Sequence, residues 1–138
     1  MRAVGQGRGV GKLLLIEPDG LIRGTVASVC RDLHLARVRQ AGSIAMAEQW
    51  LKTGRPDAVL MSLAEGDAAL DLLVRLRDGR FGCDADLPVA AMASKVDADL
   101  VARLKALEVR RLILQPFKLR DVIHTVEQLW LGAAAVPA

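Results

Sequence analysis

The amino-acid sequence predicts an α/β fold, a doubly wound five-stranded parallel sheet with strand order 2-1-3-4-5. Short apolar runs alternate five times with segments of helical periodicity, and short connections join them. The composition agrees, because the chain is 52% hydrophobic with only two Phe, two Trp and no Tyr. Such an aliphatic core is typical of a sheet that helices cover on both faces. Right-handed crossovers then favour the stated strand order.

Five apolar runs, bounded by polar or turn residues, predict the strands. The run KLLLI begins the regular part of the chain, and the second run is the weakest of the five. The third run follows Pro56 and Asp57 and is typical of a buried strand. The predicted strands are residues 12–16, 35–39, 59–63, 87–92 and 111–114.

Each strand is followed by apolar residues at helical spacing, which predicts one helix after every strand. Asp19 is placed to cap the first helix, and Pro18 fixes the direction from which the chain enters it. Ser43 is placed to cap the second helix and Gly54 to end it. The predicted helices are residues 21–33, 44–51, 67–79, 97–107 and 119–131.

The chain of 138 residues is predicted to form one domain. Residues 1–11 are Gly-rich and basic and are predicted to form a flexible arm, residues 12–132 the domain, and residues 133–138 a tail. No apolar run is long enough to span a membrane, and we expect no secretory leader. Cys30 and Cys83 lack metal-ligand spacing, and lone thiols fit a reducing compartment. We therefore expect a cytoplasmic protein without a membrane partner.

Five segments, in order, resemble the receiver domains of two-component response regulators. They are LLLIEPDGLIR at 13–23, PDAVLMSL at 56–63, LDLLVRLR at 70–77, LPVAAMAS at 87–94 and LILQPFKLRDVIHTVEQL at 112–129. The similarity runs from about residue 12 to residue 131, which is nearly the whole chain. It implies a flavodoxin-like fold and a cis peptide bond between Gln115 and Pro116.

The same resemblance implies that the phosphorylation site of the family is degenerate in this chain. The acidic pair of the family falls on Glu17 and Pro18, and its phosphoacceptor aspartate falls on Ser62. The hydroxyl that contacts the phosphate falls on Ala93, and the lysine falls on Gln115. A serine hydroxyl without a neighbouring base is a weak nucleophile, and phosphoryl transfer needs positioned cations. We therefore expect no catalytic residue, no enzyme activity and no cofactor.

A metal site at Glu17 and Asp19 is the weaker of two interpretations. Ligands bind at the carboxyl ends of the strands in open α/β sheets, but two carboxylates are a thin supply for magnesium. The commoner interpretation makes Glu17 a solvated carboxylate near a helix N-terminus and Asp19 a helix cap. We therefore predict no bound metal. Met46, Met61 and Met92 are expected to fill the core.

Six basic residues lie between residues 101 and 120, with Glu108 as the only acidic one. They are Arg103, Lys105, Arg110, Arg111, Lys118 and Arg120, which gives the segment a charge of +5 against +3 for the whole chain. Scattered Lys and Arg most often form a solvated surface. The imbalance also favours an interaction face for an acidic protein or an anionic nucleotide. Nucleic acid is the weakest option, because few aromatic residues are available for base stacking.

Three hypotheses for function follow. The first is a non-phosphorylatable receiver-like module that binds a kinase, another receiver or a second copy of itself in a two-component or phosphorelay pathway. The second is a sensor of an anionic nucleotide second messenger, such as cyclic di-GMP, that uses the basic face. The third is an atypical receiver that is still phosphorylated, which the degenerate site opposes.

Overall fold

In the computed structural model, which describes residues 10–130, five strands form one parallel sheet. They are β1 (Lys12–Ile16), β2 (Arg37–Ala41), β3 (Ala58–Ser62), β4 (Val89–Ala93) and β5 (Arg111–Leu114). Their order is β2-β1-β3-β4-β5, so the predicted fold class and strand order are confirmed. Strands β2 and β5 are therefore the two edges of the sheet.

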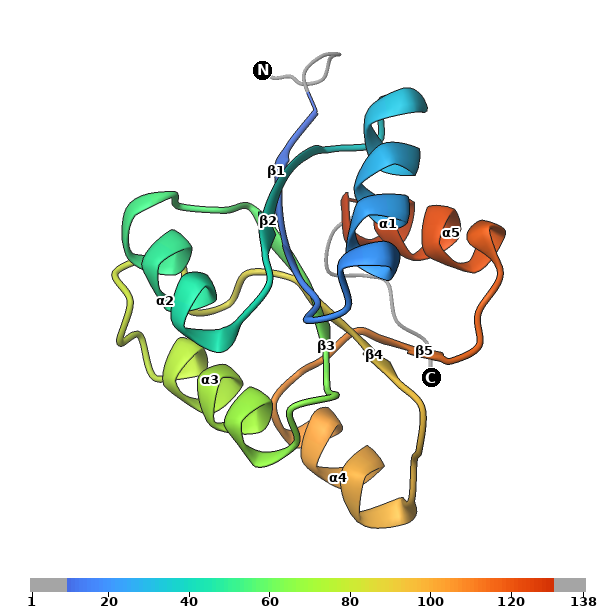
Figure 1. The fold of residues 1–138 in the computed structure, drawn as a ribbon. Coiled ribbons are helices and arrows are strands. Elements are labelled where there is room, and N and C mark those ends of the chain that lie inside the picture. Colours follow the sequence, from blue (N-terminus) through green and yellow to red (C-terminus); the bar gives the residue numbers. More distant parts are fainter. Residues whose placement is uncertain (1–9, 131–138) are drawn as a thin grey trace.

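Five helices follow the strands: α1 (Gly20–Asp32), α2 (Ile44–Thr53), α3 (Asp67–Arg77), α4 (Ala98–Ala106) and α5 (Leu119–Trp130). Helices α1 and α5 cover one face of the sheet, and α2, α3 and α4 lie on the other (Figure 1). Successive strand residues point to opposite faces. Leu13 and Leu15 of β1 therefore join the α1–α5 core, whereas Leu14 and Ile16 join the α2–α3 core.

The second and fourth strands each begin two residues later than predicted, and the other boundaries agree within two residues. After α1, Leu35 still donates its main-chain N–H to the carbonyl of Cys30 at 2.8 Å, and His34 has a φ of 55°. These residues therefore complete the end of the helix before β2 can begin. Before β4, the N–H of Leu87 bonds within a turn and Pro88 has no N–H to donate.

Both predicted helix N-caps are confirmed. Asp19 Oδ1 accepts the N–H groups of Leu21 and Ile22 in the first turn of α1 at 2.9 and 3.1 Å, and Ser43 Oγ accepts the N–H of Met46 at 3.1 Å. The prediction that Met46 is buried was wrong, because its side chain is 47% exposed. The buried stripe of α2 runs through Ala47 and Leu51, and Met46 lies beside it. The other two methionines are buried as predicted.

Arg77, the last residue of α3, connects this helix to the loops that precede β4 and β5. Its Nη1 donates to the carbonyls of Ala85 and Leu87 at 2.8 Å. Its Nε donates to the carbonyl of Leu107 at 2.8 Å, and its Nη2 to that of Glu108 at 3.2 Å. Burial lowers the pKa of this guanidinium. The four carbonyls offset the cost of burying it, because they accept hydrogen bonds from its N–H groups.

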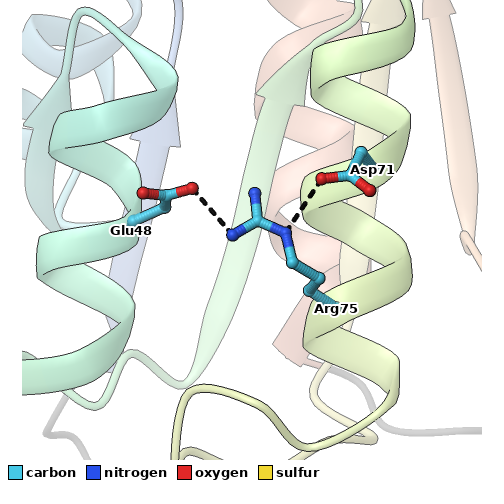
Figure 2. A network of polar contacts seen from close by, with 3 residues as sticks. All are labelled: Glu48, Asp71 and Arg75. Atoms are coloured by element: carbon cyan, nitrogen blue, oxygen red, sulfur yellow. Dashed lines mark hydrogen bonds and ion pairs between the residues drawn. The ribbon is translucent and has the colours of Figure 1, made fainter.

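Helices α2 and α3 are also joined by an ion-pair network (Figure 2). Arg75 of α3 lies between two carboxylates, at 2.7 Å from Glu48 of α2 and 2.9 Å from Asp71 of its own helix. The same guanidinium lies over the ring of Phe81, 5.4 Å from its centroid. The network is partly exposed, so its contribution to stability is modest.

The predicted arm at 1–11 and tail at 133–138 lie almost wholly outside the described residues. Gly11 is an exception, because its carbonyl accepts the N–H of Arg37 at 2.9 Å and extends the pairing of β1 with β2. Within residues 10–130, the helices are all too short or too polar to cross a membrane.

Candidate functional site at the carboxyl edge of the sheet

The residues of the predicted degenerate site lie at the carboxyl edge of the sheet, where the parallel strands end. Glu17 directly follows β1, and Ser62 and Ala93 are the last residues of β3 and β4. Gln115 follows β5 and donates its main-chain N–H to the carbonyl of Ala93 at 2.8 Å. Because β1, β3, β4 and β5 are adjacent in this order, the fold brings the four residues together. Pro18, after Glu17, is exposed.

Glu17 is only 2% exposed, which corrects the expectation of a solvated carboxylate. Its Oε2 accepts the main-chain N–H of Asp19 at 3.0 Å. Its Oε1 is buried, and no hydrogen bond from the described residues reaches it. Burial raises the pKa of the Glu17 carboxyl above its ordinary value of 4.5, although the bond from Asp19 acts in the opposite direction. The carboxyl edge therefore holds one buried carboxylate that is only half satisfied.

Arg23 of α1 is a cation that acts on the Glu17 carboxylate. Its Nη1 reaches back from α1 and donates to the main-chain carbonyl of Glu17 at 2.8 Å. The guanidinium lowers the pKa of Glu17, which offsets part of the effect of burial. A Cβ atom at Gly42 would lie only 2.9 Å from the same Nη1, so glycine leaves the space that Arg23 occupies.

Sequence analysis missed Arg23, although one signal was present. Arg23 lies near the N-terminus of α1, where the helix dipole disfavours a cation. A basic residue in this place needs a compensating anionic or carbonyl partner. The carbonyl and carboxylate of Glu17 are that partner.

Ser62 is 3% exposed and is engaged locally. Its Oγ accepts the main-chain N–H of Ala64 at 3.1 Å, which turns the chain after β3. The hydroxyl lowers the pKa of the Glu17 carboxyl, although Oε1 accepts no hydrogen bond from the described residues. Ser62 is therefore a neutral, buried group at the end of the central strand.

The remaining positions offer little for binding a phosphoryl group. Ala93 is buried and has no hydroxyl, whereas Ser94 is exposed one residue later. Gln115 has no charge, and its bond to Pro116 is cis, as predicted. A shallow, mostly apolar hollow of about 430 Å³ lies here, with Phe117 among its lining residues.

The donor set does not fit the magnesium ion that receiver chemistry uses. Magnesium requires a near-octahedral array of hard oxygen ligands. Within residues 10–130, no three carboxylate, imidazole or thiol groups come together as a metal site. The Asp19 carboxylate already caps α1, and Ser62 offers only a neutral hydroxyl.

The six cations of the predicted basic face do not all point the same way. The charge of Arg110 lowers the pKa of the Arg77 guanidinium at the end of α3. Arg111 is the next residue of an extended segment and points to the face that α1 and α5 cover. Arg103 lies 4.0 Å from the carboxylate of Asp67, toward α3. The other three, Lys105, Lys118 and Arg120, are exposed on α4 and beside the start of α5. The cations are thus distributed over both sides of β5.

No protein-family model matches the chain, and no curated protein matches it. Solved structures do match. A response regulator from Thermotoga maritima is 22% identical, with a TM-score of 0.77 over 89% of this chain and 99% of that chain. The chemotaxis response regulator CheY4 of Vibrio cholerae is 15% identical, with a TM-score of 0.77 over 88% and 99% of the two chains. The non-phosphorylated HemR receiver domain of Leptospira biflexa is 22% identical, with a TM-score of 0.74 over 91% and 98%. The chain therefore has the fold of response-regulator receiver domains.

Proposed function

We propose that this chain is a receiver-like signalling module that acts by binding other proteins and is not phosphorylated at its own site. The chemistry of the carboxyl edge supports this most strongly. A single half-satisfied carboxylate, Glu17, stands beside the neutral hydroxyl of Ser62. Such a site has no carboxylate nucleophile at the end of β3, and its cation, Arg23, is already bonded to the carbonyl of Glu17. The proposal includes no enzyme activity.

The surface around the Gln115–Pro116 turn supports a protein-binding role. Leu114 and Leu119 lie on either side of this turn and are 56% and 47% exposed. Exposed basic side chains, those of Lys118 and Arg120, lie next to them. Apolar residues with a charged rim are typical of protein interfaces, and the charge favours an acidic partner. The partner classes are a cytoplasmic kinase, another receiver or a second copy of this chain.

Incubation with acetyl phosphate and Mg²⁺, followed by intact-mass spectrometry, tests the absence of phosphorylation. We expect no mass gain for the natural chain. We also expect none for the Ser62→Asp variant, because Pro18 and Gln115 still withhold a metal ligand and a cation. A phosphorylatable receiver in the same tube is the positive control. A gain of one phosphate on either protein would favour the third hypothesis, an atypical but active receiver.

Affinity capture of native partners, read by mass spectrometry, tests the binding role. The Leu114→Asp, Leu119→Asp variant is expected to lose the partners that the natural chain captures. Met46→Asp is the control, because Met46 is 47% exposed on α2, beside β2 at the opposite edge of the sheet from this turn. Sedimentation velocity of the same three proteins reports whether the partner is a second copy. Identical partners and oligomeric states in all three would contradict an interface at this turn.

The alternative of a nucleotide sensor at the basic residues around β5 has weaker support. Its cations lie on both sides of the strand, so they do not converge on one phosphate group. Titration with cyclic di-GMP tests this alternative. Binding that disappears in the Arg111→Gln, Arg120→Gln variant would favour the sensor over the protein-binding module.

A further inference from the structure

A second cavity lies at the amino edge of the sheet, at the opposite end of the strands from the candidate site. It has a volume of about 350 Å³ and lies between the beginnings of β1 and β2 and the C-terminal end of α2. Lys12, Arg37, Arg39 and Trp50 are among its lining residues. This volume is at the lower end of the range for small-molecule sites. We call this cavity the amino-edge pocket.

The register of β1 and β2 places three cations on one face of the sheet. Lys12 pairs with Arg37, and Leu14 pairs with Arg39. Alternate residues of a strand share a face, and Leu14 packs in the α2–α3 core. The side chains of Lys12, Arg37 and Arg39 are therefore on the side of the sheet that α2 covers.

These cations are not neutralised by ion pairs in the described part of the chain. The ion pairs within residues 10–130 involve other arginines. Among residues 10–130, the one hydrogen-bond acceptor of Lys12 Nζ is the carbonyl of Gly54, at 3.3 Å. The Asp57 carboxylate is bonded to the main-chain N–H of Lys12 at 2.8 Å, so three cations and one anion leave a local charge of +2. Mutual repulsion of this kind is relieved when an anion binds.

Trp50 adds a flat surface to the pocket. The Arg39 guanidinium lies over its indole ring, 4.4 Å from the centroid. The indole Nε1 donates to the carbonyl of Gln40 at 3.3 Å, which holds the ring against the edge of β2. A guanidinium stacked in this way keeps its N–H groups available in its own plane, and its outer face can stack on another flat ring.

We propose that the amino-edge pocket binds a small organic phosphate that carries a flat ring, the chemistry of a nucleoside monophosphate. Lys12, Arg37 and Arg39 bind the phosphate, and the ring stacks on the Arg39–Trp50 pair. Planar guanidinium groups suit phosphate because each donates two parallel hydrogen bonds. The proposal is independent of phosphorylation at Ser62 and of partner binding near Leu114, because the pocket is at the other end of the strands.

Titration of the full ¹⁵N-labelled chain with AMP, GMP, CMP and UMP, each alone at low salt, tests this. The chain has two indole N–H signals, from Trp50 and Trp130, and the Trp50→Phe variant assigns them. We expect the Trp50 signal to shift saturably with at least one nucleotide. The Trp130 signal should stay in place, because its Nε1 donates to the carbonyl of Leu35 at 2.8 Å, outside the pocket. Added salt should weaken the binding.

Charge-matched variants separate the pocket from general electrostatic attraction. Arg37→Gln with Arg39→Gln is expected to weaken nucleotide affinity by about tenfold or more. Arg80→Gln with Lys95→Gln removes the same charge from exposed positions outside the pocket and is expected to leave affinity unchanged. Arg39→Lys keeps the charge but loses the planar guanidinium, so the nucleotide affinity of this variant should lie between those of the two double variants.

Two results would overturn the proposal. One is the absence of a saturable Trp50 shift with all four nucleotides. The other is equal affinity in the two double variants when their spectra show that both are folded. Inorganic phosphate and adenosine are further probes, each expected to bind about tenfold more weakly than the nucleotide. Phosphate alone binding as tightly as the nucleotide would exclude the role of the ring.

Discussion

At the carboxyl edge of the sheet the polar groups are buried and bonded to the chain itself, whereas at the amino edge the cations line an open pocket. Glu17 and Ser62 accept main-chain N–H groups, and Arg23 donates to a main-chain carbonyl. Lys12 and Arg37, by contrast, are exposed and form no ion pair within residues 10–130. Open α/β sheets usually bind ligands at the carboxyl edge. In this chain, the groups available to a ligand lie at the other edge.

Arg77→Ala should cause the largest loss of stability. It compares the two kinds of cation at the amino edge, one bonded to main-chain carbonyls and the other lining the pocket. Arg77 donates to four main-chain carbonyls, so it is a structural cation, unlike those of the pocket. Removing it leaves partly buried carbonyls unsatisfied and should lower the free energy of unfolding by about 3 kcal/mol. Urea denaturation followed by circular dichroism measures this.

Arg75→Ala is the matched control for that prediction. Arg75 lies two residues earlier on α3 and bonds to the partly exposed carboxylates of Glu48 and Asp71 (Figure 2). Its loss should cost only about 1 kcal/mol. Equal losses in the two variants would mean that the carbonyl bonds of Arg77 have no special role.

Much of the fold was predictable because it depends on local patterns. The five runs and five periodic segments gave the sheet order, and Asp19 and Ser43 were recognised as caps. The meeting of Glu17, Ser62 and Gln115 at one edge was also predictable, because parallel strands end at the same edge. The elements and the caps require only residue type and spacing, whereas the choice of Glu17, Ser62 and Gln115 as site positions depended on the resemblance to receiver domains.

The burial of Glu17 and the amino-edge pocket were not predictable in this way. The pocket joins residues from β1, β2 and α2 through the strand register, which the sequence pattern does not specify. The basic face failed for a simpler reason. Arg110 and Arg111 are consecutive residues of an extended segment, so their side chains point to opposite faces. Charge counted along the sequence did not translate into charge on one surface.

Ser62→Asp should cause the second largest loss of stability. It tests whether the carboxyl edge of the sheet can accept a second anion. The new carboxylate would be buried beside Glu17 without a metal ion. Like charges raise the pKa of one group, so at pH 7 the free energy of unfolding should fall by about 2 kcal/mol. The loss should shrink as pH falls, because protonation of one carboxyl removes the repulsion. A variant as stable as the natural chain at pH 7 would show that Arg23 or solvent compensates the second charge.

Glu17→Gln should raise the free energy of unfolding, by less than Ser62→Asp lowers it. Burial raises the pKa of Glu17 in the folded state, so the folded chain binds a proton more strongly than the unfolded chain. The cost of the charged carboxylate is therefore absent below about pH 4.5 and complete above the higher pKa of the folded state. Glutamine can accept the N–H of Asp19 with its oxygen and place its amide beside Ser62. We expect the variant to be more stable by about 1 kcal/mol at pH 7.

The pH dependence of that difference is the decisive measurement. Denaturation curves at pH 7 and pH 4 should show the advantage of Glu17→Gln shrinking as Glu17 in the natural chain becomes protonated. Glu127→Gln is a suitable control, because Glu127 is an exposed carboxylate on α5 and undergoes the same change of side chain. A constant difference at both pH values would mean that the charge on Glu17 is not the source of the cost.

Arg39→Gln should have the smallest effect on stability and sharpens the comparison between the two edges. Arg39 is exposed, and its contact with the Trp50 ring is worth only about 0.5 kcal/mol at a surface. We therefore expect the free energy of unfolding to change by about that amount, while nucleotide affinity falls. Thermal denaturation with and without a saturating nucleoside monophosphate measures both effects, because a ligand that binds the folded state raises its melting temperature. The opposite result would be a loss of stability as large as that of Arg77→Ala, with the nucleotide raising the melting temperature as much as in the natural chain. Arg39 would then be a structural residue like Arg77, and the cations of the pocket would not differ from the carbonyl-bonded cation at the same edge.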